Sequence, residues 1–289
     1  MRTADFLLLI VVAAIWGGAY PLLRVGSPEF GPVALVVVRL AIASVVLLPL
    51  ARWRPSVLLQ WRKLLLLGLI NTALPFALFA YATLHITGGL ASVINATTPM
   101  FGAVVAYFWL GERLGPMRVL GIAIGFAGVL FIVGGEIGTS TDDSLIGVIA
   151  ALLGSAMYGI AANYTKRQLG TLDTKVIAAG NVVAAFLIMA PFTWFTWPAK
   201  SPSTSAWWAV VALGLFCTAL AYLLFFRLLS RVSASQAITV TFLIPIFGIL
   251  WGALFLDEPI TRVLLVSAGV VLVGVALATG LVRPRFPWR

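Results

Sequence analysis

Apolar residues along this chain run in long blocks that short polar segments separate. A block of about 20 apolar residues is long enough to cross the hydrocarbon core of a bilayer as a helix. The pattern predicts an all-α integral membrane protein, and ten transmembrane helices leave almost nothing of the 289 residues for a soluble domain. The expected spans are 6–23, 32–50, 64–84, 90–110, 116–134, 145–165, 175–195, 207–226, 236–256 and 262–282.

The second half of the chain repeats the first. Residues 68–134 align without a gap on residues 214–280, an offset of 146 that pairs Pro99 with Pro245. Further upstream the offset is 142, which pairs Arg24 with Lys166. We therefore expect a five-helix repeat over 1–135, an external linker over 136–144 and a second five-helix repeat over 145–289. An odd number of spans inverts the second copy, and many transporters build a central cavity from inverted repeats.

Composition and charge sidedness agree with a membrane protein. The chain is 62% hydrophobic and only 10% charged, with a mean hydropathy of +1.09. Of its 19 basic residues, 15 lie at the two termini and in the loops 51–63, 111–118, 166–175 and 227–231, whereas the opposite loops hold only Arg24, Lys200 and Arg262. The positive-inside rule then predicts cytoplasmic termini and, in a bacterium, an inner-membrane location. The basic excess is interpreted as topology and anionic-lipid contact, not nucleic-acid binding.

The sequence offers little material for an enzyme or a cofactor site. Cys217 is the only cysteine and His85 the only histidine, and no metalloprotease, nucleophile-elbow or phosphate-loop motif is present. Asp142 and Asp143 could suggest a metal site, but two carboxylates in one loop are more typical of a solvated helix N-cap. We expect no catalysis, no metal and no cofactor, and keep a membrane enzyme or scaffold as the alternative.

Polar and aromatic residues inside otherwise apolar spans are costly in lipid and are therefore candidates for a substrate path. Several occupy matched positions in the two halves, as Trp16 and Tyr158 do, which favours a central cavity over isolated roles. For a single aromatic residue the alternative is a packing role at the membrane interface or in the core. For a single Asn or Thr the alternative is a hydrogen bond between helices. The candidates for substrate binding are Trp16, Tyr20, Asn71, Phe79, Asn95, Thr98, Tyr158, Asn163, Asn181, Tyr222 and Thr241.

Arg39 is the one basic residue within a span, roughly 10 Å deep when counted from Pro32 at the helical rise. A structural role would have it snorkelling outward or bonded to a freed carbonyl. A functional role would have it drawing in or gating a substrate carboxylate. Both roles stay open, with the structural one favoured. No acid lies in the central part of a span, and Glu112 and Glu258 are expected to begin the following helices.

Prolines and glycines suggest how the spans bend and pack. Pro99 and Pro245 predict matched kinks that act as gates in the two halves, with simple packing kinks as the alternative. Gly121, Gly125 and Gly128, and Gly274 with Ala278, form small-residue faces that let helices approach closely. We expect these faces to pack inside a monomer, with a dimer contact as the weaker alternative.

These features together resemble the drug/metabolite transporter superfamily, in its ten-helix branch with two EamA-type repeats. The resemblance covers nearly the whole chain and rests on Trp16-Gly17, Arg39, the segments from Thr97-Thr98-Pro99 to Leu114, and from Ile244-Pro245 to Pro259. It implies helices one to four and six to nine around a central cavity. The chain is similar to YddG-like exporters, which implies export of aromatic and other neutral amino acids, with another metabolite or a drug as the alternative substrate.

Overall fold

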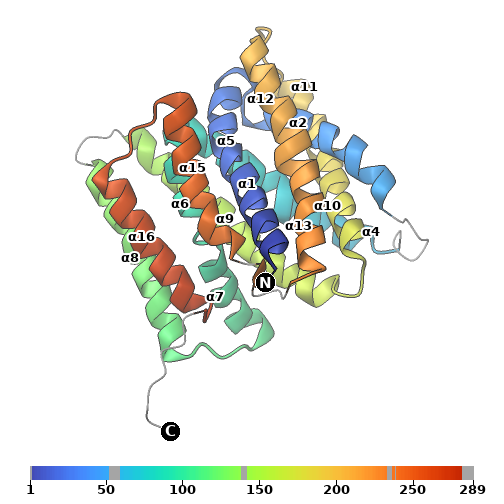
Figure 1. Ribbon diagram of the computed structural model, residues 1–289. Coiled ribbons are helices and arrows are strands. Elements are labelled where there is room, and N and C mark those ends of the chain that lie inside the picture. The colour runs from blue at the N-terminus through green and yellow to red at the C-terminus, as the bar shows by residue number, and fades with distance from the viewer. Residues whose placement is uncertain (1, 52–58, 138–141, 233–235, 238, 282–289) are drawn as a thin grey trace.

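The computed structural model describes residues 2–51, 59–137, 142–232, 236–237 and 239–281, and the elements assigned in this part of the chain are helices (Figure 1). Eight helical segments are long and apolar enough to cross a membrane, and two shorter apolar helices follow them near the C-terminus. The prediction of an all-α membrane protein is confirmed. The eight segments are Thr3–Phe30, Pro32–Leu50, Trp61–His85, Gly88–Leu110, Pro116–Gly134, Asp143–Gln168, Thr174–Thr196 and Thr204–Leu229, and the shorter helices are Val240–Leu256 and Arg262–Ala278.

Three of the eight long segments are single helices, and the other five consist of two or three successive elements. In chain order the first half contains α1 (Thr3–Phe30), α2 (Pro32–Leu47), η1 (Leu48–Leu50), α4 (Trp61–Gly68), η2 (Leu69–Ala73), α5 (Leu74–His85), α6 (Gly88–Asn95), α7 (Thr98–Leu110) and α8 (Pro116–Ile137). The second half contains α9 (Asp142–Gln168), α10 (Thr174–Met189), η3 (Ala190–Phe192), α11 (Thr193–Thr196), α12 (Thr204–Gly214), η4 (Leu215–Leu220), α13 (Ala221–Leu229), α15 (Val240–Leu256) and α16 (Arg262–Ala278).

The bundle has two ends, which we name by the chain segments found there. The terminal face is the end where α1 begins and α16 ends (Figure 1). The linker face is the opposite end, where α8 ends and α9 begins. Of the predicted linker 136–144, residues 138–141 lie outside the described residues.

Two spans contain a π-helical turn at equivalent positions of the two halves. η2 begins at Leu69 and η4 at Leu215, which the offset of 146 pairs. A π-turn leaves a carbonyl without its usual amide partner, and such turns are frequent at functional sites. In η4 the Thr218 hydroxyl donates to the freed Leu213 carbonyl at 2.9 Å. The sequence contains no proline or other breaker inside these turns, so it gave no signal for them.

The two matched prolines do not bend their helices alike. Pro99 lies in the first turn of α7, after a break that separates α6 from α7, whereas Pro245 lies inside the continuous helix α15. At the break, the Ile94 carbonyl accepts hydrogen bonds from the Thr97 hydroxyl at 2.6 Å and the Ser155 hydroxyl at 3.1 Å. In the second half the Thr239 hydroxyl likewise donates to the Gln236 carbonyl at 2.6 Å. This turn precedes Pro245 by six residues, whereas Thr97 precedes Pro99 by two, so the expected matched kinks are unequal.

Helices of the two halves cross at paired glycines. A Cβ atom on Gly17 in α1 would lie 2.9 Å from the Gly248 nitrogen in α15. Its repeat counterpart Gly159 in α9 would meet the Gly102 nitrogen in α7 at 2.6 Å. Because neither backbone can retreat from such a contact, both crossings require glycine.

The small-residue faces of α8 and α16 pack against one another inside this chain. A Cβ atom on Gly121 would lie 2.4 Å from the Ala278 nitrogen, and one on Gly274 would lie 2.4 Å from the Gly125 nitrogen. The two helices stand together at one side of the bundle (Figure 1). The predicted use of these faces within a monomer is confirmed in this structure, since each covers the other.

The helices α7 and α15 end in the same way. Gly111 and Asp257, again 146 positions apart, follow them in the left-handed conformation, with φ of 68° and 53°. The next helices begin only at Pro116 and Arg262. The prediction that Glu112 and Glu258 begin these helices was therefore wrong, because both glutamates lie in the connecting segments and their side chains reach other helices.

Candidate functional site

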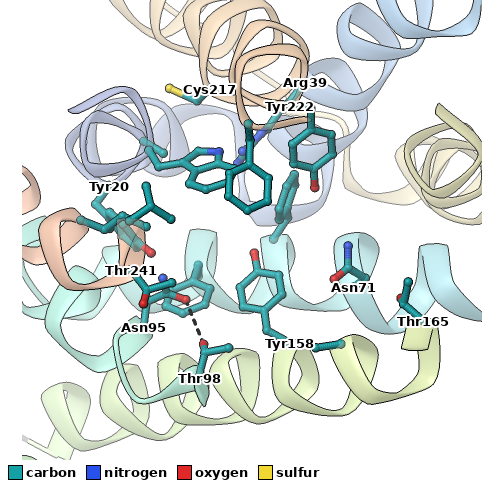
Figure 2. A pocket seen from close by; sticks show the side chains of 18 of the residues that line it. Tyr20, Arg39, Asn71, Asn95, Thr98, Tyr158, Thr165, Cys217, Tyr222 and Thr241 are labelled. Atoms are coloured by element: carbon teal, nitrogen blue, oxygen red, sulfur yellow. Dashed lines mark hydrogen bonds between the residues drawn. The ribbon is translucent and has the colours of Figure 1, made fainter. Parts of the chain in front are cut away.

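A cavity of about 490 Å³ lies in the middle of the bundle (Figure 2). Side chains from both halves line it, which brings together residues more than 200 positions apart in the chain. Of the residues predicted from sequence, those that line it are Trp16, Tyr20, Arg39, Asn71, Phe79, Asn95, Thr98, Tyr158, Tyr222 and Thr241.

The cavity extends from the centre of the bundle toward the terminal face. Thr165 lies in the last turn of α9, Phe226 in the last turn of α13, and Val240 begins α15, and all three line the cavity. These helix ends lie at the terminal face, where α1 begins (Figure 1). No lining residue comes from the last turn of α1, α5 or α15 at the linker face.

Aromatic rings form much of the wall, and they pair across the two halves. Trp16 in α1 lies 5.0 Å from Phe225 in α13, centroid to centroid, and Tyr158 in α9 stacks on Phe79 in α5 at 6.0 Å. Phe79 and Phe225 are 146 positions apart, so these are the same pair formed twice. Sequence reasoning missed Phe225, although its repeat counterpart Phe79 was a candidate and pointed to it.

Interrupted helix segments supply the neutral polar groups of the wall. Asn71 lies in η2, while Asn95 and Thr98 flank the break between α6 and α7. The Thr98 hydroxyl donates to the Asn95 amide oxygen at 3.4 Å (Figure 2). Irregular backbone is tolerated at membrane depth where it lines a cavity. The repeat counterparts of Asn71 and Asn95 are Cys217 and Thr241, and both also line the cavity.

Arg39 lies at the cavity wall with 4% of its surface exposed. Its Nε atom donates to the Thr218 hydroxyl at 2.8 Å, and its guanidinium carbon lies 3.7 Å from the centre of the Phe76 ring. Neither expected structural role is seen, because Arg39 does not snorkel outward and its hydrogen-bond acceptor is a hydroxyl, not a freed carbonyl. The π-turn η4 positions that hydroxyl.

Two candidate asparagines lie outside the cavity lining. Asn163 donates to the carbonyls of Gly102 and Gly159, both at 2.9 Å, and so ties α9 to α7. Asn181 is 2% exposed in α10, and its amide oxygen is buried without a hydrogen-bond partner among the described residues. Pro99 and Pro245 also do not line the cavity. For Asn163 the alternative interpretation, a hydrogen bond between helices, describes what the structure shows.

A polar network closes the linker face, and we call it the linker-face lock. The Glu258 carboxylate accepts from the Gly88 and Gly89 amides at 2.8 and 3.1 Å and lies 3.3 Å from Arg24 Nε. Arg24 also donates to the carbonyls of Thr83 and Ile86, at 3.0 and 2.9 Å. These contacts tie α1, the end of α5, the start of α6 and the segment after α15 together. The Glu258 side chain is 8% exposed and the Arg24 side chain 38%, so the carboxylate of the lock is shielded from solvent and the guanidinium is partly exposed.

The repeat counterpart of this contact is an exposed ion pair at the terminal face. Lys166 Nζ lies 2.8 Å from Glu112, and these residues correspond to Arg24 and Glu258. The hydrogen bond from Lys166 and its positive charge lower the pKa of the Glu112 carboxyl. With 40% of the Glu112 side chain exposed, water screens this pair far more than the lock.

Comparison with known proteins covers nearly the whole chain. The model of the EamA-like transporter family matches residues 4–134 and 145–280. The uncharacterized transporter YvbV of Bacillus subtilis (strain 168) is 29% identical over 277 residues, which span 94% of this chain and 90% of YvbV. The uncharacterized inner membrane transporter YedA of Escherichia coli (strain K12) is 26% identical over 94% of this chain and 89% of its own.

A crystal structure and a plant protein extend the comparison. The crystal structure aligns with 97% of this chain and 98% of its own, with a TM-score of 0.68 and 22% identity, which supports the fold alone. The WAT1-related protein At3g02690, chloroplastic, of Arabidopsis thaliana is 25% identical over 94% of this chain and 69% of its own.

Proposed function

Since this chain belongs to the EamA-like transporter family, we propose that it exports neutral and aromatic amino acids, or similar small metabolites, by alternating access. The observation that carries the proposal is the central cavity, which reaches toward the terminal face while the lock closes the linker face. A membrane transporter needs a polar and aromatic path with two gates, and it needs no bond-making residue. Another metabolite or a drug is the alternative cargo.

The reciprocal contacts support two inverted five-helix repeats, and therefore ten transmembrane helices. Contacts of the first half on the second recur with the halves exchanged, at the glycine crossings, the aromatic pairs and the two ion pairs. Such exchange is what a two-fold relation between the halves produces. The shorter helices α15 and α16 are then the ninth and tenth spans, each about 26 Å long at 1.5 Å per residue.

We place the terminal face in the cytoplasm, and the protein in a bacterial inner membrane, on the charge asymmetry of the loops. The cavity then faces inward, as loading of an exported substrate requires. Export would follow when the linker-face lock opens and the helix ends at the terminal face close over the cavity. The Lys166–Glu112 pair is already formed at 2.8 Å while the cavity reaches the terminal face, so this pair is not the closing gate.

The cavity suits a small molecule with an apolar body. Its volume of about 490 Å³ lies within the range of ligand sites, roughly 300–1,000 Å³. Trp16, Tyr20, Phe79, Tyr158 and Tyr222 would contact the apolar part, and Asn71, Asn95, Thr98 and Thr241 would bind polar groups. Asn163 and Asn181 we now assign to helix packing around the cavity.

Transport by purified protein in liposomes tests this proposal. Uptake or release of labelled phenylalanine, threonine and methionine is expected, and Trp16→Ala and Tyr158→Ala should each reduce its rate about tenfold or more, because each removes half of an aromatic pair. Trp194→Ala is the matched control, since Trp194 is 88% exposed and lies outside the cavity. If none of the three amino acids is transported, the proposal that the cargo is an amino acid is excluded.

A further inference from the structure

Arg39 presents unused hydrogen-bond donors at the cavity wall. Its Nε atom is bonded to Thr218, and Phe76 covers its guanidinium plane. Within the described ranges of the chain, neither of its terminal NH₂ groups has a hydrogen-bond acceptor or an acidic partner. These groups are the fork that binds a carboxylate in bidentate fashion.

The charge of the cavity wall is also unbalanced. Among the described residues that line the cavity, Arg39 alone carries a formal charge, and the wall contains no Asp or Glu. A buried charge without a partner is costly, and removing its water is tolerated only where a counter-charge or several hydrogen bonds replace the water. A bound anion would supply that counter-charge.

The remaining wall discriminates between the two charged groups of an amino acid. A carboxylate at Arg39 would lie beside Tyr158 and Tyr222, whose hydroxyls reach into the cavity from α9 and α13 (Figure 2). An ammonium group would find amide and hydroxyl oxygens and ring faces, but no carboxylate. The wall therefore provides a strong site for the acid group and only weak ones for the amine.

We propose that Arg39 binds the carboxylate of the cargo, so that this cavity selects apolar and aromatic monocarboxylates and does not require an amino group. The inference rests on the proposed transport function, whose cargo it narrows. The cargo class then includes aryl and alkyl carboxylic acids that lack nitrogen, alongside neutral amino acids. Amines without a carboxylate are excluded, because they would leave Arg39 unpaired and add a second positive charge.

Three probes with the same phenyl group and two-carbon chain test the inference on the wild-type protein. These are 3-phenylpropanoate, phenylalanine and 2-phenylethylamine, and their Kd values are measured by calorimetry on purified protein in detergent. We expect the acid to bind at least as tightly as phenylalanine, and the amine about tenfold or more weakly than either. Equal binding of acid and amine, or no binding of any probe at millimolar concentration, would overturn the inference.

Variants then assign the preference to Arg39. Arg39→Gln should remove the preference for acid over amine, and Arg39→Lys should keep part of it, since lysine retains the charge but not the fork. Arg262→Gln removes an exposed charge outside the cavity and should leave the preference unchanged. A preference that survives in folded Arg39→Gln protein would contradict the assignment. If Arg39→Gln does not fold, the wild-type probe series alone decides.

Transport of the same probes separates this inference from the function it rests on. Arg39-dependent binding of the acid with no transport in liposomes would refute the transport proposal and leave the carboxylate site standing. Transport of acid and amine at equal rates would support the transport proposal and refute the carboxylate site at Arg39.

Discussion

Replacing Glu258 by glutamine is expected to destabilise the protein and to open its linker face. The carboxylate accepts two backbone hydrogen bonds and faces Arg24, and only 8% of its side chain is exposed. Glutamine keeps the size but turns one acceptor into a donor that opposes these groups. Removing a buried charge with such partners lowers the free energy of unfolding by about 2–4 kcal/mol. This figure is smaller than for a fully buried pair because Arg24 is partly exposed.

Part of that loss should appear as a change in conformation. A relative stabilisation of the state open at the linker face by about 2 kcal/mol would raise its population about thirtyfold. Leu23 lines the cavity next to Arg24, so a cysteine there reports on access from the linker face. In a Leu23→Cys, Cys217→Ser background, Glu258→Gln should speed labelling by a membrane-impermeant maleimide added at that face.

Glu112→Gln is the matched control, since it changes the repeat counterpart of the same residue. Its pair with Lys166 is exposed, and exposed pairs contribute about 0–1 kcal/mol. We expect little change in the midpoint of thermal unfolding and no faster labelling at the linker face. Equal effects of the two glutamine variants would show that burial of the lock has no role in closing the linker face.

The second large effect is expected at the crossing of α1 and α15. In Gly17→Ala the new Cβ atom would lie 2.6 Å from Phe247 Cβ and 2.9 Å from the Gly248 nitrogen, so the two helices must separate. Overpacking of this kind costs about 1–3 kcal/mol. Because α1 and α15 both line the cavity, transport should fall together with the unfolding midpoint in detergent.

Gly18→Ala provides the control at the neighbouring position. The nearest atom to its new Cβ would be Trp251 Cδ1 at 3.6 Å, which is an ordinary contact. Alanine is the better helix former by about 1 kcal/mol, so this variant should be neutral or slightly stabilising. A Gly17→Ala protein as stable as Gly18→Ala would contradict the close crossing of α1 and α15.

The repeat register carried much of the fold. Its offset of 142 relates Gly17 to Gly159 and Arg24 to Lys166, and these pairs make equivalent contacts in the structure. The register did not reveal where the halves differ. Pro99 closely follows the turn at Thr97, whereas Pro245 lies inside α15, six residues after the similar turn at Thr239.

The partners of Glu258 illustrate what local reasoning misses. The sequence placed this residue at a helix start, where a helix dipole favours an acid. The structure places its carboxylate at the amides of Gly88 and Gly89, about 170 positions earlier in the chain. A helix N-terminus does bind it, but that helix is α6 of the other half.

Hydropathy by itself determined that this chain is a helical membrane protein with a duplicated pattern, because the preference of each side chain for lipid is read directly from the sequence. Only the tertiary structure decided which polar residues reach the cavity. Asn95 lines it, whereas Asn163 donates a hydrogen bond to the Gly102 carbonyl of a neighbouring helix. The rotation of a helix about its axis makes that difference, and glycine crossings between distant helices set the rotation.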